Sequence, residues 1–172
     1  YGFTTDIESE QIPKGIDKKT VQLISSIKKE PKWVTDFRLK GYKSWIRQDH
    51  PEWHHLDIPE IDFQDIVYYS APGGQNKPKS IEDLDPELIE TYKKLGIPLA
   101  EMGAIEGVAV DAVFDSVSIA TTARAELEKH GVIFCSISEA IKDYPDMVKK
   151  YMGKVVPIND NFYSALNSAV FS

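Results

Sequence analysis

The spacing of apolar side chains predicts a first helix that begins after Asp17. This residue can cap the helix, because its carboxylate accepts a hydrogen bond from a free backbone N–H of the first turn. The apolar residues that follow recur at helical spacing and are expected to share one face: Val21, Leu23, Ile24 and Ile27. The helix is expected to end near Pro31, and residues 1–14 are expected to form an extended arm.

Pro31 also suits the first turn of a second helix. Six apolar residues would share a wide face of that helix: Trp33, Val34, Phe37, Tyr42, Trp45 and Ile46. Four cations would lie on its polar side: Arg38, Lys40, Lys43 and Arg47. A basic aromatic helix can bind nucleic acid or a peptide, but such stripes are more often buried, because aromatic side chains bury so much area. We therefore predict a helical hairpin whose aromatic stripe packs within this chain.

The middle of the chain alternates between extended and helical patterns. Residues 61–70 favour a short strand or an extended segment packed on the helices, and prolines and a glycine pair in 71–78 predict a loop. A helix is expected between Asp85 and Gly96. The stretch 108–119 alternates like a strand, and its phase slips near Ser116, which predicts a bulge or turn there.

The last fifty residues carry the densest local signals. Thr121 or Thr122 can cap a helix that ends before Gly131, and the apolar run 132–135 is expected to form a strand, giving a strand–helix–strand unit. Ser136 and Glu139 form a capping-box pattern that predicts a further helix.

Two more helices are expected near the end of the sequence. Pro145 can open one, and Gly153 can end it; Asn159 or Asp160 can cap the last, whose apolar side consists of Phe162, Leu166 and Val170. The final apolar run, 169–171, is instead typical of the start of a strand, so we expect an unfinished edge there and a chain that is a piece of a longer protein.

These elements predict an α+β fold in three parts. Residues 1–70 would hold the arm, the helical hairpin and the extended segment, 71–79 a loop or linker, and 80–172 a small α/β region. The chain has 172 residues, 42% of them hydrophobic and 27% charged, which is ordinary for a globular protein. Its apolar runs fall short of the roughly 20 residues that span a bilayer, so no membrane association is expected.

The net charge of −7 is unevenly distributed. Residues 1–56 carry 10 basic and 8 acidic side chains, whereas residues 57–172 carry 10 basic and 19 acidic side chains. An acidic surface repels phosphate backbones, so nucleic-acid binding is disfavoured. The single cysteine cannot form an internal disulfide, which fits a reducing compartment such as the cytoplasm.

Three groups of residues were candidates for chemistry. His50, His54 and His55 lie near carboxylates, the ligand set of a borderline metal, but their spacing matches no recognised site; a metal-dependent enzyme using this loop is the alternative hypothesis. Asp111 and Asp115 would be about 13 Å apart on a strand, too far for a catalytic carboxylate pair. Cys135 is expected to be a buried, inert thiol, although a helix start beside it would make it reactive.

Several longer strings make the chain recognisable: AVDAVFDSVSIATT, GVIFCSISEAI, VKKYMGKVVP and DNFYSALNSAVFS, with YGFTTDIES, IDFQDIVYYSAP and DPELIETYKKLGIPL before them. They resemble the N-terminal part of SufB in the SufB/SufD family, scaffold proteins of SUF iron-sulfur cluster assembly. The resemblance implies a segment that leads into a right-handed parallel β-helix, which this sequence does not contain.

The resemblance also implies a function and partners. Such a scaffold builds iron-sulfur clusters with SufC-like and SufD-like subunits and accepts sulfur from a cysteine desulfurase or sulfur-transfer protein, in the cytoplasm or in the plastid stroma of a photosynthetic eukaryote. The cluster-assembly residues would lie outside this chain. We therefore expect a structural or interaction role here, with no enzymatic activity, no catalytic residues, and no metal or cofactor bound by this segment.

Overall fold

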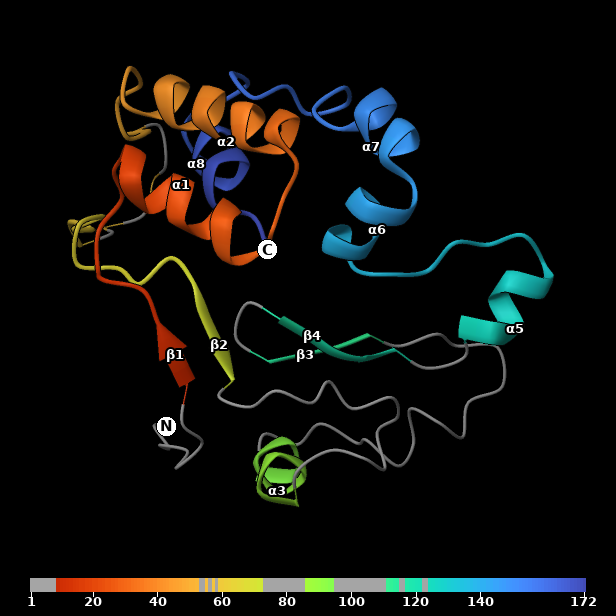
Figure 1. Ribbon diagram of the computed structural model, residues 1–172. Coiled ribbons are helices and arrows are strands. Elements are labelled where there is room, and N and C mark those ends of the chain that lie inside the picture. The colour runs from red at the N-terminus through yellow and green to blue at the C-terminus, as the bar shows by residue number, and fades with distance from the viewer. Residues whose placement is uncertain are drawn as a thin grey trace. The chain divides into compact units, whose positions relative to one another are not determined.

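The computed structural model of the protein describes residues 9–52, 55, 57, 59–72, 86–94, 111–114, 117–121 and 124–172 (Figure 1). Its helices are α1 (Lys18–Ile27), α2 (Lys32–Trp45), α3 (Pro86–Lys94), α5 (Arg124–Lys129), α6 (Ile137–Asp143), α7 (Pro145–Tyr151) and α8 (Phe162–Val170). Its strands are β1 (Ser9–Gln11), β2 (Ser70–Pro72), β3 (Asp111–Phe114) and β4 (Val117–Thr121). Helices with short two-stranded sheets confirm the predicted α+β class.

The chain forms two compact units, each made from two stretches of sequence. One contains residues 1–10 and 70–136, and the other contains residues 11–69 and 137–172. Most of the predicted linker 71–79 lies outside the described residues, so the predicted boundaries stay a prediction.

Helix α1 begins where the cap pattern predicts. The Thr20 backbone N–H donates to Asp17 Oδ1 at 2.7 Å, and Val21 and Ile24 are fully buried. The prediction that Leu23 and Ile27 lie on the same buried face is wrong, since they are 41% and 44% exposed. At about 100° per residue, both point well away from the direction of Val21, so the core touches only a narrow stripe of α1.

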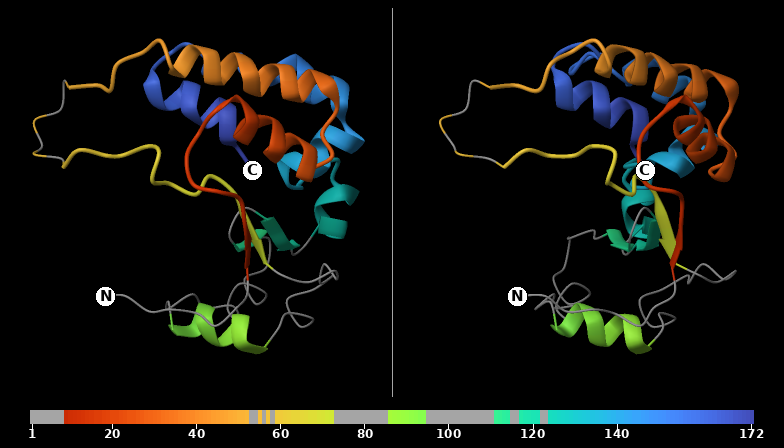
Figure 2. Two further views of the ribbon diagram at one scale, coloured as in Figure 1. Left: turned by 60° about the vertical axis from the view of Figure 1, so that its left-hand side comes forward. Right: turned by 90° about the vertical axis from the view of Figure 1, so that its left-hand side faces the viewer.

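Helices α1, α2 and α8 lie side by side in both sets of views (Figures 1 and 2). Ser25 Oγ of α1 and Thr35 Oγ1 of α2 share a hydrogen bond of 2.6 Å. A Cβ built on Gly41 of α2 would lie 2.8 Å from the backbone nitrogen of Ala169 in α8. The backbones of α2 and α8 therefore approach as closely as a glycine permits.

The face of α2 that enters the core differs from the prediction at two positions. Val34 and Trp45 are buried as expected, but Ile46 is 56% exposed. Arg38, which was expected on the polar side, is fully buried. Arg38 can lie inside because its guanidinium is paired there, as described below.

The core of this unit combines aromatic and aliphatic side chains. It contains Trp45 and the following buried residues: Ile16, Val21, Phe162, Ala165 and Ala169. Phe63 and Tyr68 pack against it, so the stretch 61–70 packs on the helices as predicted, but a turn at residues 62–65, where the Asp65 N–H donates to Asp62 O at 3.1 Å, interrupts its extended course. Within the described part of the chain, the buried Trp45 Nε1 has no hydrogen-bond acceptor.

In the other unit, β1 pairs with β2, and β3 pairs with β4 in an antiparallel hairpin. Phe114 stands opposite Val117, so the stretch predicted as one alternating strand contains two paired strands, and the pairing shifts register between Ala112 and Val113. Residues 115–116, like 108–110, lie outside the described residues. Helix α3 forms where predicted. Because Thr121 belongs to β4, it is not the predicted cap of α5.

The predicted strand 132–135 is wrong, because these residues form an irregular segment. The Val132 N–H donates to Leu127 O at 3.0 Å and the Gly131 N–H donates to Glu128 O at 3.0 Å. With Gly131 at φ +74°, these bonds form a Schellman motif that closes α5. The first amide of the expected strand is therefore used to end the preceding helix.

The breaks around α6 and α7 follow the sequence. α6 starts directly after Ser136 and ends at Asp143, α7 starts at Pro145, and Gly153 follows it at φ +67°.

The end of the sequence departs from the prediction. Helix α8 is capped by Asn161, whose Oδ1 accepts from the N–H groups of Tyr163 and Ser164 at 2.9 Å each, rather than by Asn159 or Asp160. The expected strand at 169–171 is wrong as well. Its first two residues belong to α8, where Ala169 is fully buried against α2.

Candidate functional site

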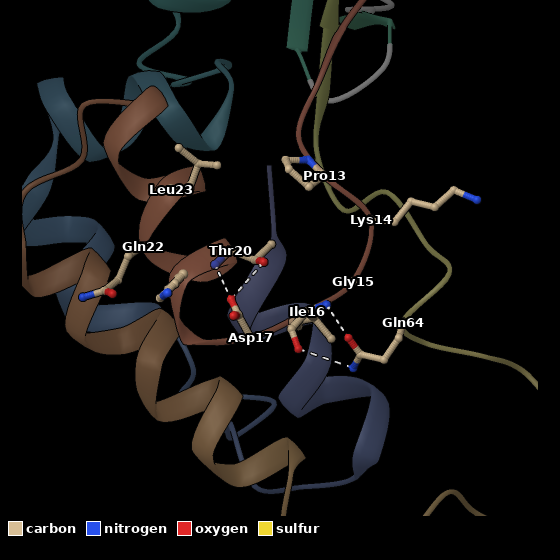
Figure 3. A pocket seen from close by; sticks show the side chains of 10 residues that line it. Pro13, Lys14, Gly15, Ile16, Asp17, Thr20, Gln22, Leu23 and Gln64 are labelled. Atoms are coloured by element: carbon tan, nitrogen blue, oxygen red, sulfur yellow. Dashed lines mark hydrogen bonds between the residues drawn. The ribbon is translucent and has the colours of Figure 1, made fainter.

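An open groove of about 640 Å³ lies beside the N-terminal end of α1 (Figure 3). Residues 13–17, four residues of α1 and Gln64 line it. The Gln64 amide joins two distant parts of the chain: the Ile16 N–H donates to Gln64 Oε1 at 3.0 Å, and Gln64 Nε2 donates to Ile16 O at 3.4 Å (Figure 3). The groove therefore marks the place where the segment leading into α1 is fixed to the segment around Gln64.

Gly15 is required at this junction. Its φ of +93° lies in the left-handed region, and an added Cβ would lie 2.8 Å from Gln64 Oε1. The Gly15 N–H donates to Ile66 O at 2.9 Å, so its backbone lies directly against the neighbouring segment.

The Asp17 carboxylate lies in the groove at the start of α1. The Thr20 backbone N–H holds the pKa of Asp17 below its ordinary value, outweighing the opposing effect of desolvation. Lys14 Nζ, from the groove lining, pairs with Asp65 Oδ1 at 2.6 Å, and both side chains are exposed. Thr20 Oγ1 donates to Asp17 Oδ1 at 3.1 Å beside the bond from the Thr20 backbone N–H, so these polar groups hold the start of α1 in place.

The predicted histidine loop is only partly described, because His54 lies outside the described residues. His55 is exposed, and His50 Nε2 shares a hydrogen bond of 2.7 Å with Tyr163 Oη. The His50 ring also stands 5.4 Å from the Phe162 ring and 5.9 Å from the Phe63 ring. His50 is therefore engaged in an aromatic cluster next to the core.

Within the described ranges, no group of three His, Cys, Asp or Glu side chains is placed to hold a metal ion. The same ranges contain no helix that is long and apolar enough to cross a membrane.

Two other candidates are described only in part. Cys135 is a half-buried residue outside any disulfide, in the irregular segment before α6. Asp111 stands in β3 opposite Thr121, and Asp115 lies outside the described residues.

The sequence prediction missed a buried ion pair between Arg38 and Glu30. Arg38 Nη2 donates to Glu30 Oε1 at 2.6 Å and Nε donates to Glu30 Oε2 at 2.7 Å, with side chains 0% and 2% exposed. Arg38 Nη1 donates to Ala169 O at 3.2 Å, and the guanidinium carbon lies 3.8 Å from the centre of the Phe171 ring. One side chain thus joins the α1–α2 connection to the C-terminal end of α8.

A second hollow lies along the outer side of α2. Its lining residues are Lys40, Lys43, Ser44, Arg47, Gln48 and Asn159. Three of the six carry positive charge and none is acidic. In the described part of the chain, this hollow is the best candidate for a surface that binds another molecule, because its charges are exposed and of one sign.

Comparisons with known proteins now identify the family. The family model described as SufBD protein N-terminal region matches residues 101–172. Over all 172 residues, the chain is 55% identical to the "Iron-sulfur cluster assembly SufBD family protein ycf24" of Porphyra purpurea. Along its whole length the chain is similar to SufBD family proteins.

Other SufBD relatives show the same degree of similarity. The chain is 55% identical to ABCI8 of Arabidopsis thaliana, whose name includes "chloroplastic", and 54% identical to slr0074 of Synechocystis sp.. In each case the whole of this chain is matched, but only 35%, 31% and 36% of the Porphyra, Arabidopsis and Synechocystis proteins is covered. The chain therefore spans about a third of the length of these curated relatives.

Proposed function

We propose that this chain is part of a SufB-like scaffold for iron-sulfur cluster assembly. The observation that carries the proposal is the 55% identity over all 172 residues to a protein named for that process. In this proposal the segment has a structural and interaction role, and the cluster is cargo that is built elsewhere on the scaffold.

The cysteine content of the segment supports a structural role for it, with the cluster built elsewhere on the scaffold. An iron-sulfur cluster is usually held by four protein ligands, most often cysteine thiolates, and this chain contains one cysteine. Cys135 is half-buried, and the described residues contain no group that could complete a ligand set. We therefore assign no catalytic, metal or cofactor residues to the segment.

The proposal includes partners and a place in the cell. SufC-like and SufD-like subunits would form the complex, and a cysteine desulfurase or sulfur-transfer protein would supply sulfur. The region would precede a parallel β-helix, and the complex would work in the cytoplasm or the plastid stroma. Names that include "chloroplastic" among the relatives support the second location.

A chimera tests the proposal. Residues 1–172 replace the aligned residues of the full-length Synechocystis relative, which is co-expressed with SufC-like and SufD-like proteins of that organism. The chimera is expected to retain both partners on purification and to restore cluster assembly in cells depleted of the parent. The parent lacking the aligned residues is the control. A chimera that folds but loses its partners would contradict the proposal.

The alternative, a metal-dependent enzyme that uses His50, His54 and His55, makes a different prediction. Such a protein would retain about one equivalent of a transition metal after dialysis, because histidine and carboxylate sites bind these ions tightly. Elemental analysis of the dialysed chain, with a His54→Ala/His55→Ala variant as control, separates the two hypotheses.

A further inference from the structure

The basic hollow on α2 consists of charges that the fold leaves available. Lys40, Lys43 and Arg47 are exposed, and none of them forms an ion pair with a described residue. The other two cations of α2 form ion pairs. Arg38 pairs with Glu30 in the protein interior, and Lys32 Nζ pairs with Asp36 Oδ2 at 2.7 Å. The unpaired cations are therefore gathered at one end of α2.

The three cations line one hollow. Lys40 and Lys43 are three residues apart on α2, and Arg47 follows four residues later in the turn after the helix ends at Trp45. Neutral hydrogen-bonding groups complete the hollow: Ser44 and Gln48, joined by a hydrogen bond of 3.1 Å, and the exposed amide of Asn159. Carboxylates spaced three and four residues apart on a second helix would complement these cations in charge.

Other anions fit this surface less well. Proteins that bind single-stranded nucleic acid provide aromatic side chains on which bases stack, whereas Trp45 of α2 is buried and Phe37 packs edge-on against Phe171. A single phosphate would pair with fewer of the three exposed cations than a helix that carries three carboxylates.

We propose that the basic hollow of α2 docks an acidic helical segment of a partner protein, with Lys40, Lys43 and Arg47 pairing with carboxylates spaced three and four residues apart. The proposal goes beyond cluster assembly, because it concerns a docking surface that a binding assay reads directly. Its failure would leave the chimera experiment unaffected.

The test uses a fluorescent helical peptide with glutamates at its first, fourth and eighth positions and a twin peptide with glutamines there. Fluorescence anisotropy of the full chain at about 50 mM NaCl is expected to show binding of the glutamate peptide alone. Raising NaCl to about 500 mM should weaken that binding strongly, because exposed charges are screened.

Matched variants assign the binding to the hollow. The triple variant Lys40→Gln, Lys43→Gln, Arg47→Gln is expected to bind about tenfold more weakly, since each exposed pair contributes a factor of about 1.5 to 5. A second triple variant removes the same charge from exposed lysines elsewhere, at Lys18, Lys29 and Lys142, and should bind almost as the unchanged chain does. Circular dichroism confirms that both variants stay helical, and Lys43→Arg should retain binding.

Three outcomes would overturn the proposal. The first is equal binding by the two triple variants, and the second is equal binding of the glutamate and glutamine peptides. The third is displacement of the peptide by inorganic phosphate or by an oligothymidine at equal charge concentration, which would assign the hollow to phosphate groups.

Discussion

At the scale of single residues, Arg38 connects the end of α1, helix α2 and the end of α8. A fully buried guanidinium is tolerated only where its donors are satisfied, and here Glu30, the Ala169 carbonyl and the Phe171 ring surround it. The sequence pattern classed Arg38 as polar and therefore exposed. Periodicity reports only polarity, so it cannot distinguish an exposed arginine from one whose partner lies at the end of the preceding helix.

Removing the Arg38 guanidinium while keeping the Glu30 carboxylate should destabilise the folded protein. Arg38→Met leaves Glu30 buried without a partner, and we expect it to lower the free energy of unfolding by about 3 to 5 kcal/mol. Urea unfolding followed by circular dichroism measures this. In the double variant Arg38→Met/Glu30→Leu, most of that loss should be recovered; a single variant that loses less than about 1 kcal/mol would show that the pair is unimportant.

The lowered pKa of Asp17 predicts how the stability of the unit that contains α1, α2 and α8 changes with pH. Because its folded pKa is below the ordinary value, its contribution to stability is fully present above the unfolded pKa and is lost as pH falls through the folded pKa. The variant Asp17→Asn keeps a capping side chain but does not titrate. Between about pH 5 and pH 2, the urea midpoint of the unchanged chain should fall more steeply than that of Asp17→Asn; parallel curves would contradict this assignment.

At the scale of elements, the local signals predicted where helices begin more reliably than what they contact. The Asp17 cap, Pro145 and the Gly131 and Gly153 stops are all used as expected, because each acts within one turn of the chain. The burial of α1 and α2 was predicted less well. The sequence does not show that α8, more than a hundred residues later, packs against α2.

The strand predicted at 132–135 and the edge predicted at 169–171 failed because a short apolar run does not specify a strand. The backbone N–H of Val132 is used locally to close α5, whereas the backbone of Ala169 belongs to a helix that packs against α2, so a helix end decided the first case and a tertiary contact the second.

The close contact between α2 and α8 predicts that replacing Gly41 by alanine lowers the stability of the protein. Gly41→Ala should stabilise an isolated helix by about 1 kcal/mol. Here the new Cβ would lie within 3 Å of the backbone of α8, and such overpacking costs about 1 to 3 kcal/mol. Thermal unfolding should therefore show a lower midpoint for Gly41→Ala, whereas the exposed neighbour Lys40→Ala should show no loss. An unchanged or higher midpoint for Gly41→Ala would contradict the close packing.

At the scale of the whole molecule, the family was predictable from the sequence, and the candidate site was not. The strings quoted from across residues 1–172 indicated the SufBD family, which the family model and the relatives confirm. The spacing placed Lys40, Lys43 and Arg47 on the polar side, where they are exposed, but it could not predict that Arg38 is buried or that Asn159 lies beside the other three.

The central claim is that this SufBD segment supports a scaffold and holds no cluster itself. Its most direct test is anaerobic reconstitution of the isolated chain with iron and sulfide, followed by desalting and iron and sulfide assays, beside the full-length Synechocystis relative. With one cysteine in the chain, we expect only traces of iron and sulfide on the segment and a stable cluster on the full-length protein. A stable, stoichiometric cluster on the isolated monomeric chain would contradict the claim.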